Sequence, residues 1–493
     1  MNGTSNKMES NYFDVLIIGA GVSGINSAYR VQSEVPGATY TILETREHLG
    51  GTWDFWKYPG IRSDSDLHTF GFPWRPWTDR KPIADGPDIM KYLTETAGIH
   101  GIDKHIRYKH FFQSANWSTE EQKWTVTTIV DGEERYYTGN FLILSTGYYD
   151  YKEPLPVVIP GIENFKGKVI HPQFWPEGQD YSNKRIVVIG SGATAVTLVP
   201  NLAEKAEHVT MLQRSPTYLF SIPNRKWSLS HMILPKWLAS RFDRLWFLTV
   251  PFLFFRFCRA YPTVARSILR LLTTRQLPKS VPHDPHFVPK YNPWEQRLCA
   301  CPDGDFFKAL RRGKASVATG VIKSVTETGI TLESGQELPC DMIVTATGLK
   351  IQLAGGADLR VDGASFQVSE KFMWKGMMLQ DLPNAAFVIG YTNASWTLGA
   401  DTTAQVIVRL LNRMKKDGAT SVVPRVPHPE KMTQTPVLNL NSTYVVRAME
   451  RLPKVGNSGP WKPRENYFVD YWNSRYGSVY DGLEYVKPVT AQL

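Results

Sequence analysis

The sequence predicts an α/β fold with two Rossmann-like dinucleotide-binding domains. Two segments, DVLIIGAGVSGINSAYRV at residues 14–31 and RIVVIGSGATAVTLVPNL at residues 185–202, repeat the same order of apolar strand, glycine turn and helical pattern. Each begins with a run rich in β-branched residues, which is typical of a buried parallel strand that feeds a crossover helix. The length of 493 residues exceeds the size that one hydrophobic core usually organises, so at least two domains are expected.

The chain is expected to build its first domain from both ends. FLILSTG at residues 141–147 and MIVTATG at residues 342–348 have the pattern of short buried strands that end in glycine turns, where the chain returns to a sheet. Residues 223–293 are helical in pattern, rich in arginine and interrupted by prolines, which indicates a helical insertion in the second domain. The expected order is the first part of the first domain at 1–150, the second domain at 160–340, and the return with a C-terminal segment at 341–493.

The composition is that of an ordinary globular protein, with 42% hydrophobic and 21% charged residues. The net charge is +10, but the 56 Lys and Arg residues form no polybasic block, so nucleic acid is not an expected partner and an anionic cofactor explains the sign equally well. The four cysteines form neither a disulfide framework, nor a redox C-x-x-C pair, nor a zinc pattern, so no metal is expected. These cysteines are Cys258, Cys299, Cys301 and Cys340.

Nothing in the sequence predicts export or a membrane span, because the N-terminus is polar and no run approaches the ~20 apolar residues of a spanning helix. A cytoplasmic protein is therefore expected. One segment, LWFLTVPFLFF at residues 245–255, is strongly apolar and is bracketed by arginines. We interpret it as a buried helix pair broken at Pro251; the alternative is peripheral membrane association through residues 241–259.

The first glycine turn, GAGVSG, has Gly19, Gly21 and Gly24 in the G-x-G-x-x-G spacing. The first glycine permits the tight turn, the second lets the backbone approach a pyrophosphate, and the third lets the helix pack on the strand. Glu44 lies twenty residues past Gly24, at the end of TYTILE, where an acid accepts hydrogen bonds from a free ribose 2′-hydroxyl. FAD or NAD offers such a ribose.

The second turn, GSGATA, has Gly190 and Gly192, with Ala195 in the third position. At the end of the next expected strand there is no acid, and the sequence reads Gln213 and Arg214 instead. A guanidinium pairs with a 2′-phosphate through charge-assisted hydrogen bonds, whereas a carboxylate would repel it. The contrast predicts NADPH rather than NADH at this site.

Two dinucleotide units in one chain indicate that a nicotinamide reduces a flavin, since hydride transfer needs the two rings in contact. These motifs leave the electron acceptor open, and a disulfide, a quinone, a protein partner and oxygen all remain alternatives. The missing cysteine pair disfavours only the first.

A resemblance to a known family enters at FKGKVIHPQFWPE, which matches the pattern F-x-G-x-x-x-H-x-x-x-W-P of type I Baeyer–Villiger monooxygenases. The related N- and S-oxygenating flavin enzymes usually have Tyr or Phe at the Trp position, so Trp175 favours the Baeyer–Villiger branch. The matched positions are Phe165, Gly167, His171, Trp175 and Pro176.

Further segments extend the resemblance over nearly the whole chain. DPHFVPKYNPWEQRLC and GYTNASWTLGAD look most like the ethionamide-activating monooxygenase subgroup, and Trp396 of the latter is assigned to the cofactor site on that basis. GTWDFWKYPGIRSD completes a second family pattern, with Gly51, Trp53, Tyr58, Pro59, Gly60 and Asp64.

The resemblance implies an FAD- and NADPH-dependent enzyme that forms a C4a-peroxyflavin with O2 and converts a ketone into an ester or lactone, with sulfoxidation as an additional activity. By the same resemblance Arg297 in WEQRLC lies against the flavin with Asp64 as its matched acid, and these two residues are the catalytic pair. His171 is implied to couple domain movement to turnover. Many family members have Lys where this chain has Gln296, so Arg214 alone would carry the preference for NADPH. Two alternatives stay open: N- or S-oxygenation as the main activity, and a redox-sensing flavoprotein that binds a partner.

Overall fold

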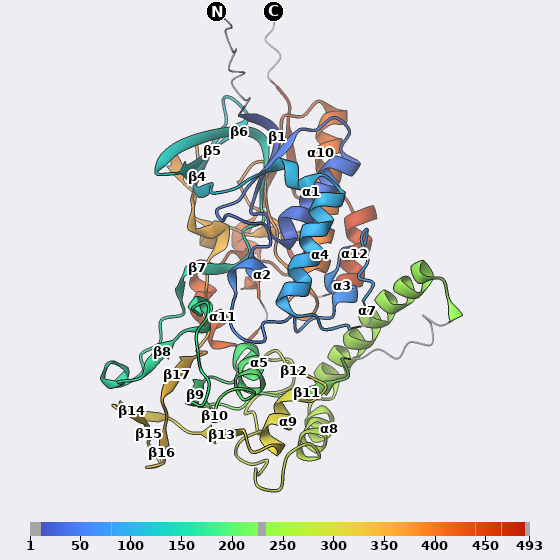
Figure 1. Cartoon of the computed structure of the whole chain (residues 1–493). Helices are drawn as coiled ribbons and strands as arrows, with labels where there is room; N and C mark the ends of the chain where they lie inside the picture. Colours follow the sequence, from blue (N-terminus) through green and yellow to red (C-terminus); the bar gives the residue numbers. More distant parts are fainter. Residues whose placement is uncertain (1–10, 80, 225–232, 439, 465, 489–493) are drawn as a thin grey trace, which may run out of the picture.

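The computed structural model describes residues 11–79, 81–224, 233–438, 440–464 and 466–488. The described chain forms two bodies, each built on its own sheet, one above the other in Figure 1. The mixed α/β fold with parallel sheets agrees with the fold class that the sequence predicts.

The upper body is built on a sheet with strand order β20-β19-β4-β5-β6-β1-β2-β3, in which β23 also pairs with β6. The central strand β1 is parallel to β2 and β6, and Ile18 at its end lies opposite Leu43 and Leu144. Helix α1 follows β1 at the first glycine turn and packs against α10, which closes the core on this face. The bounds are β1 (Tyr12–Ile18), α1 (Val22–Glu34), β2 (Tyr40–Leu43), β3 (Ile106–Arg107), β4 (Phe111–Ser118), β5 (Lys123–Val130), β6 (Glu133–Leu144), β19 (Asp358–Val361), β20 (Ala364–Ser365), β23 (Ala385–Phe387) and α10 (Trp396–Asp417).

The lower body is built on a five-stranded parallel sheet with order β13-β10-β9-β17-β8. Its last strand along the chain, β17, begins at Met342 and pairs with both β8 and β9. The second body therefore continues a few residues past the expected boundary at residue 340. The bounds are β8 (Lys168–Ile170), β9 (Arg185–Ile189), α5 (Ala193–Leu202), β10 (His208–Gln213), α9 (Asp305–Arg311), β13 (Ala315–Thr319) and β17 (Met342–Thr345), with a small antiparallel sheet of β14 (Ile322–Thr326), β15 (Gly329–Leu332) and β16 (Glu337–Pro339).

The chain passes between the two bodies through a two-stranded antiparallel ribbon. Strand β7 (Tyr149–Pro154) leaves the upper body and β18 (Leu349–Ile351) returns to it. Pro154 lies opposite Leu349 and Tyr149 opposite Ile351, so the outgoing and returning segments run side by side.

The described part of the insertion includes two helices, α7 (Lys236–Ala260) and α8 (Pro262–Thr274); α8 packs on β11 (Leu219–Ile222), which pairs with β12 (Cys299–Pro302), and α7 packs on α8 and on α3 (Leu67–Phe70). The expected buried helix pair broken at Pro251 is wrong, because α7 continues through Pro251 and many of its large apolar side chains are exposed. No helix among the described residues is long and apolar enough to cross a membrane.

The remaining elements lie between β2 and β3 and in the C-terminal part of the chain. They include α2 (Thr52–Phe55), α3 (Leu67–Phe70), α4 (Gly86–Ile99), β21 (Met373–Trp374), β22 (Met378–Leu379), β24 (Ser421–Pro424), β25 (Thr435–Pro436), α11 (Thr443–Ala448), β26 (Lys454–Val455), α12 (Tyr467–Tyr476) and β27 (Leu483–Val486).

Candidate active site

The two glycine turns have the same local geometry. The amide of Gly19 donates to the carbonyl of Leu43 at 2.8 Å, and that of Gly190 donates to the carbonyl of Leu212 at 2.8 Å. Both glycines have positive φ, +98° and +137°, which L side chains rarely adopt. The repeat seen in the sequence is therefore a repeat of structure.

Neighbouring backbone approaches the first turn closely. A Cβ on Gly24 would lie 1.9 Å from the Gly19 carbonyl oxygen, so only glycine lets α1 pass this close to the turn. The backbones of Gly21 and Gly51 pack against each other, and a Cβ on Gly51 would lie 3.1 Å from the Cα of Gly21. Bare backbone at this place, beside the N-terminus of α1, lets a pyrophosphate approach the amides of the turn.

Glu44 lies directly beside this turn, immediately after β2. Its carboxylate accepts from the amide of Ala20 at 2.6 Å and from that of Arg46 at 2.9 Å, and its burial raises the pKa of the carboxyl group against these hydrogen bonds. A buried acceptor at this place can receive ribose hydroxyls of an adenosine held on the turn.

The second turn is more open. Nothing lies within 4 Å of a Cβ built on Gly192, whereas one on Gly190 would lie 2.3 Å from the carbonyl oxygen of Ala346. Ala195 is buried in α5 against the sheet. Arg214 follows β10 and lines the same cavity as Gly190 and Gly192, where a 2′-phosphate could meet its guanidinium.

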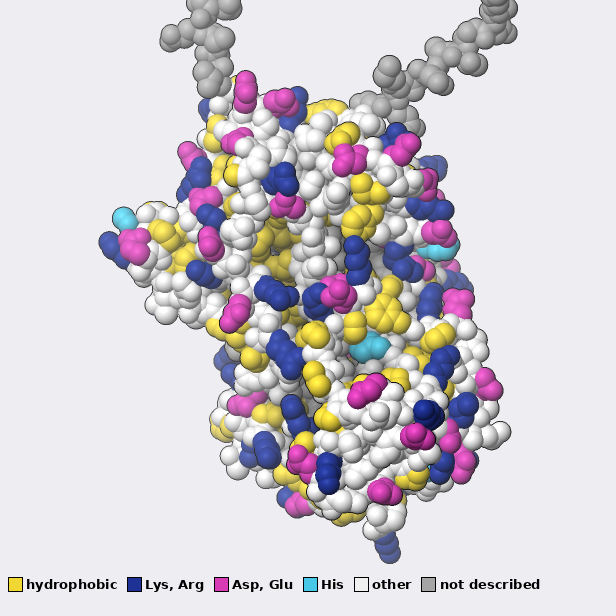
Figure 2. Space-filling model, turned by 90° about the vertical axis from the view of Figure 1, so that its left-hand side faces the viewer, with side chains coloured by type: hydrophobic (Ala, Val, Ile, Leu, Met, Phe, Trp, Pro, Cys, Tyr) yellow, Lys and Arg dark blue, Asp and Glu magenta, His cyan; other side chains and the backbone are white. Residues whose placement is uncertain are grey.

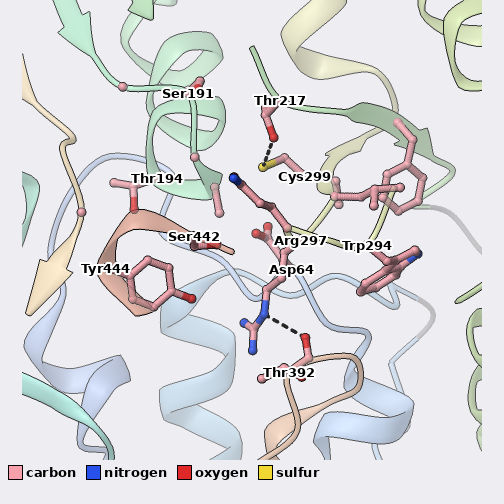
Figure 3. Close-up of a pocket in the computed structure, with 18 of the residues that line it drawn as sticks. Asp64, Ser191, Thr194, Thr217, Trp294, Arg297, Cys299, Thr392, Ser442 and Tyr444 are labelled. Carbon is pink, nitrogen blue, oxygen red and sulfur yellow. Dashed lines mark hydrogen bonds between the residues drawn. The ribbon is translucent and has the colours of Figure 1, made fainter. Parts of the chain in front are cut away.

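A cavity of about 1250 Å³ adjoins the second turn and the surroundings of Arg297. It extends from the second glycine turn, past Asp64 and Arg297, to the insertion helices α7 and α8. Figure 3 shows Asp64 and Arg297 side by side in it, with Tyr444 and Ser442 of the C-terminal segment on one side. Residues from the two bodies and from the C-terminal segment thus meet at one place.

Arg297 is held by backbone. Its Nε donates to the carbonyl of Thr392 at 3.0 Å and its Nη2 to that of Tyr391 at 3.1 Å. Arg297 is accessible from the cavity; partial desolvation there lowers the pKa of its guanidinium, but the surrounding Tyr148, Tyr444, Tyr149 and Asp64 raise it, and the net pKa of Arg297 is raised. The guanidinium therefore stays charged at any ordinary pH.

Asp64 interacts with Arg297 through charge. Burial raises the pKa of Asp64, and the positive charges of Arg62 and Arg297 act in the opposite direction. Arg62 itself contacts the carboxylate of Asp305 at the start of α9. The orienting contacts of Arg297 go to carbonyl oxygens that sequence reasoning missed, although Tyr391 and Thr392 belong to the quoted GYTNASWTLGAD segment.

Tyr148, Tyr149 and Tyr444 are a further group that no motif indicated. Tyr148 and Tyr149 follow the glycine turn after β6, and their hydroxyls are 2.8 Å apart. Trp396, at the start of α10, stacks on Tyr148 with ring centroids 5.0 Å apart, and its Nε1 donates to Ser23 Oγ of α1 at 2.8 Å. This links the first turn to the surroundings of Arg297.

The segment that carries Gly51 and Asp64 spans both bodies. Trp53 in α2 meets Phe70 edge to face at 5.6 Å in the upper core. Tyr58 is buried in the lower core, and a Cβ on Gly60, which follows Pro59, would lie 2.1 Å from Nδ2 of Asn201 in α5. Gln296 lines the cavity beside Arg297, and its amide lies 3.5 Å from the carbonyl of Asn441.

The fingerprint segment lies at the edge of the lower sheet, next to the connecting ribbon. Phe165 and Trp175 are buried, Pro176 is exposed, and a Cβ on Gly167 would lie 2.5 Å from the carbonyl oxygen of Asp341. His171 lines the cavity; burial lowers the pKa of its imidazole and a hydrogen bond with the backbone of Gly348 opposes that effect.

Gln173 joins this segment to the ribbon, because its Nε2 donates to the carbonyl of Asp150 in β7 at 2.7 Å. The fingerprint therefore contacts both connections between the bodies.

The chain matches a family described as flavin-binding monooxygenase-like over residues 13–416. It is 47% identical over 473 residues to the FAD-containing monooxygenase EthA of Mycolicibacterium smegmatis, covering 95% of this chain and 96% of the relative. It is 45% identical to the probable FAD-binding monooxygenase AlmA of Acinetobacter baylyi, covering 93% of each chain.

Solved structures show the same fold. An oxidized steroid monooxygenase bound to NADP superposes with a TM-score of 0.75 at 21% identity, covering 97% of this chain and all of that one. An open structure of cyclohexanone monooxygenase superposes with a TM-score of 0.74 at 22% identity, covering 96% of this chain and 99% of that one.

Proposed function

Because the chain belongs to the flavin-binding monooxygenase-like family, we propose that it carries out Baeyer–Villiger oxygenation, the insertion of one oxygen atom from O2 next to the carbonyl of a ketone. The reaction consumes ketone, O2, NADPH and a proton, and gives an ester or lactone, NADP⁺ and water. The protein is a flavin-dependent monooxygenase that uses FAD and NADPH. The names of its relatives and its two dinucleotide turns agree on this.

FAD suits the first turn, and NADPH the second. The bare backbone at Gly21 and Gly51 and the buried carboxylate of Glu44 supply what an adenosine diphosphate needs. Arg214 beside the second turn supplies a cation for the 2′-phosphate. When bound, the two cofactors supply the hydride and the activated oxygen, while the protein binds, orients and excludes water.

The observation that carries the proposal is the permanently charged Arg297 in the cavity. Oxygen that attacks a carbonyl carbon must remain an anion, and a guanidinium stabilises negative charge without giving up a proton. The carbonyls of Tyr391 and Thr392 hold this cation in place, and Asp64 balances its charge. In this role Arg297 is the catalytic cation.

The test is product analysis with purified, flavin-loaded protein. Cyclohexanone, NADPH and isotope-labelled O2 are expected to give a lactone that carries one labelled oxygen atom, detected by gas chromatography and mass spectrometry. A matched sulfide tests the alternative chemistry, because sulfoxide without lactone would show N- or S-oxygenation to be the main activity. NADPH consumption that no ketone or sulfide changes would favour a redox sensor and overturn the proposal.

A further inference from the structure

Helix α7 presents an apolar face to solvent along most of its length, and Figure 1 shows it projecting from the body of the molecule. The exposed side chains recur at helical spacing, and Leu245 and Leu253 are each 57% exposed. Scattered surface leucines need no explanation, but a continuous face of this kind does. The α7 members of the face are Trp237, Leu238, Phe242, Leu245, Trp246, Val250 and Leu253.

Helix α8 extends this face. It exposes apolar side chains at positions i, i+4, i+7 and i+8, which share one side of a helix. They are Val264, Ile268, Leu271 and Leu272. Together with the α7 members they are called the α7–α8 surface below.

The opposite side of α7 packs against the rest of the protein. Arg244 donates to the carbonyls of His68 and Gly71 at 2.7 and 3.0 Å, and Phe247 stacks on His68 with ring centroids 5.0 Å apart. The helix is thus fixed in the orientation that leaves its apolar face outward.

Basic side chains outnumber acidic ones around the α7–α8 surface, where Asp284 pairs with Arg270 at 3.2 Å and Glu295 interacts through charge with Arg259 and Arg266. Asp243 is the one acidic residue between positions 236 and 275, and its side chain is buried. Arg241, Arg256, Arg259 and Arg266 are exposed on the two helices. The face of the molecule shown in Figure 2 is different, because acidic and basic side chains are interspersed over it.

The surface is continuous with the active-site cavity. Trp246 and Val250 of α7 and Ile268 and Leu272 of α8 are exposed, and they also line the cavity that contains Arg297. An apolar path therefore joins the place of reaction to the exposed helices.

We propose that the α7–α8 surface rests on an anionic lipid bilayer, so that the cavity opens toward lipid and lipophilic ketones enter from the membrane. Exposed apolar side chains that include tryptophan, on helices that also carry exposed arginines, suit the boundary between headgroups and acyl chains. Pairing with a second copy of the same surface would set arginine against arginine, which disfavours a dimer. The entry of ketones rests on the proposed function, whereas the docking on lipid does not.

The docking is tested by cosedimentation of the holoenzyme with vesicles. Vesicles of equal parts phosphatidylglycerol and phosphatidylcholine are expected to bind the protein, and pure phosphatidylcholine vesicles or high salt to bind it much more weakly. Arg256→Gln/Arg259→Gln should weaken binding about thirtyfold, which corresponds to about 1 kcal/mol for each charge. Lys91→Gln/Lys104→Gln removes the same charge from exposed positions elsewhere and should change binding little.

The contribution of apolar side chains to vesicle binding is tested with a second matched pair of variants. Leu253→Glu on α7 should abolish vesicle binding, whereas Ile99→Glu, at a position that is exposed to at least the same degree at the end of α4, should not. Sedimentation velocity without lipid is run on the wild type and on both variants. Equal binding by the wild type and Leu253→Glu would overturn the proposal, and so would a wild-type dimer that Leu253→Glu dissociates, since the surface would then be a protein interface.

Substrate entry is tested with the same variant. Leu253 does not line the cavity, so Leu253→Glu should convert water-soluble cyclohexanone at the wild-type rate but lose most of its rate with 2-dodecanone presented in anionic vesicles. Equal rates from vesicles would overturn entry through lipid. If no ketone reacts in any variant, the proposed function fails, and the vesicle measurements still decide the docking.

Discussion

Replacing Arg297 by alanine should separate flavin reduction from oxygenation. NADPH should still reduce the flavin, because hydride transfer depends on how the two rings are positioned. The ketone should no longer be converted, because the positive charge that stabilises the activated oxygen is gone. The variant is expected to consume NADPH and to release hydrogen peroxide in place of ester.

The size of the effect follows from the contacts of Arg297. The loss of one preorganised donor to a developing anion usually costs a factor of about 10² to 10³, or ~2.7–4 kcal/mol. Ester formed per NADPH oxidised should fall by about that factor. Two carbonyl oxygens, of Tyr391 and Thr392, also lose their donor, which costs up to about 1–3 kcal/mol of stability for each that stays dry.

Stopped-flow absorbance measures reduction, peroxide release is followed by a coupled assay, and chromatography measures the ester. Thermal unfolding checks that the variant is folded. Arg297→Lys is the matched control, because it keeps a charge without the planar fork that reaches both carbonyls, and it should recover part of the ester yield. Near-normal ester formation by Arg297→Ala would refute both the catalytic role and the reasoning from charge.

Three further predictions concern the cofactors and stability. Arg214→Ala should raise the KM for NADPH about ten- to a hundredfold and change that for NADH little, since only NADPH carries a 2′-phosphate; equal losses in steady-state assays would make Arg214 structural. Gly24→Ala should purify with little flavin, because its Cβ would lie 1.9 Å from the Gly19 carbonyl oxygen, whereas Gly98→Ala, which meets nothing within 4 Å, should keep its flavin and gain ~0.5–1 kcal/mol; the flavin-to-protein absorbance ratio and the Tm distinguish them. Burial raises the pKa of Asp66 to about 6, so the folded protein holds this proton and loses the associated stability as pH rises through about 6. The unfolding free energy of the wild type relative to Asp66→Asn should therefore fall by about 2–3 kcal/mol between pH 4 and pH 7, and a flat difference would contradict the assignment.

The parts of the fold that local patterns encode could be predicted from the sequence. A buried strand, a glycine turn and a helix follow one another within about thirty residues, so both dinucleotide units were recognisable, and Arg214 lies beside the second turn as its spacing suggested. Whether a strand belongs to one sheet or the other depends instead on pairing between distant segments. That is why the boundary at residue 340 cut off β17, whose partners are β8 and β9.

The interpretation of the insertion was wrong for a different reason. A proline removes one backbone hydrogen bond and crowds the preceding turn, so Pro251 was expected to end a helix. Helix α7 nevertheless continues to Ala260, and the apolar run that suggested burial lies partly at the surface. The contacts that orient Arg297 could not be foreseen either, because backbone carbonyls have no residue type by which a sequence would reveal them.

The ribbon of β7 and β18 makes the segment between these two strands removable as one piece. Since Pro154 and Leu349 are neighbours across two antiparallel strands, a hairpin loop of about 2–5 residues would rejoin the upper body if everything between them were cut out. The removed piece is one uninterrupted stretch of coding sequence and contains every strand of the lower sheet. The lower body is thus one continuous insertion in the chain of the upper body, and exchanging it between relatives requires two junctions at the ribbon and also preserved contacts with Tyr58 and with the carbonyls of Tyr391 and Thr392.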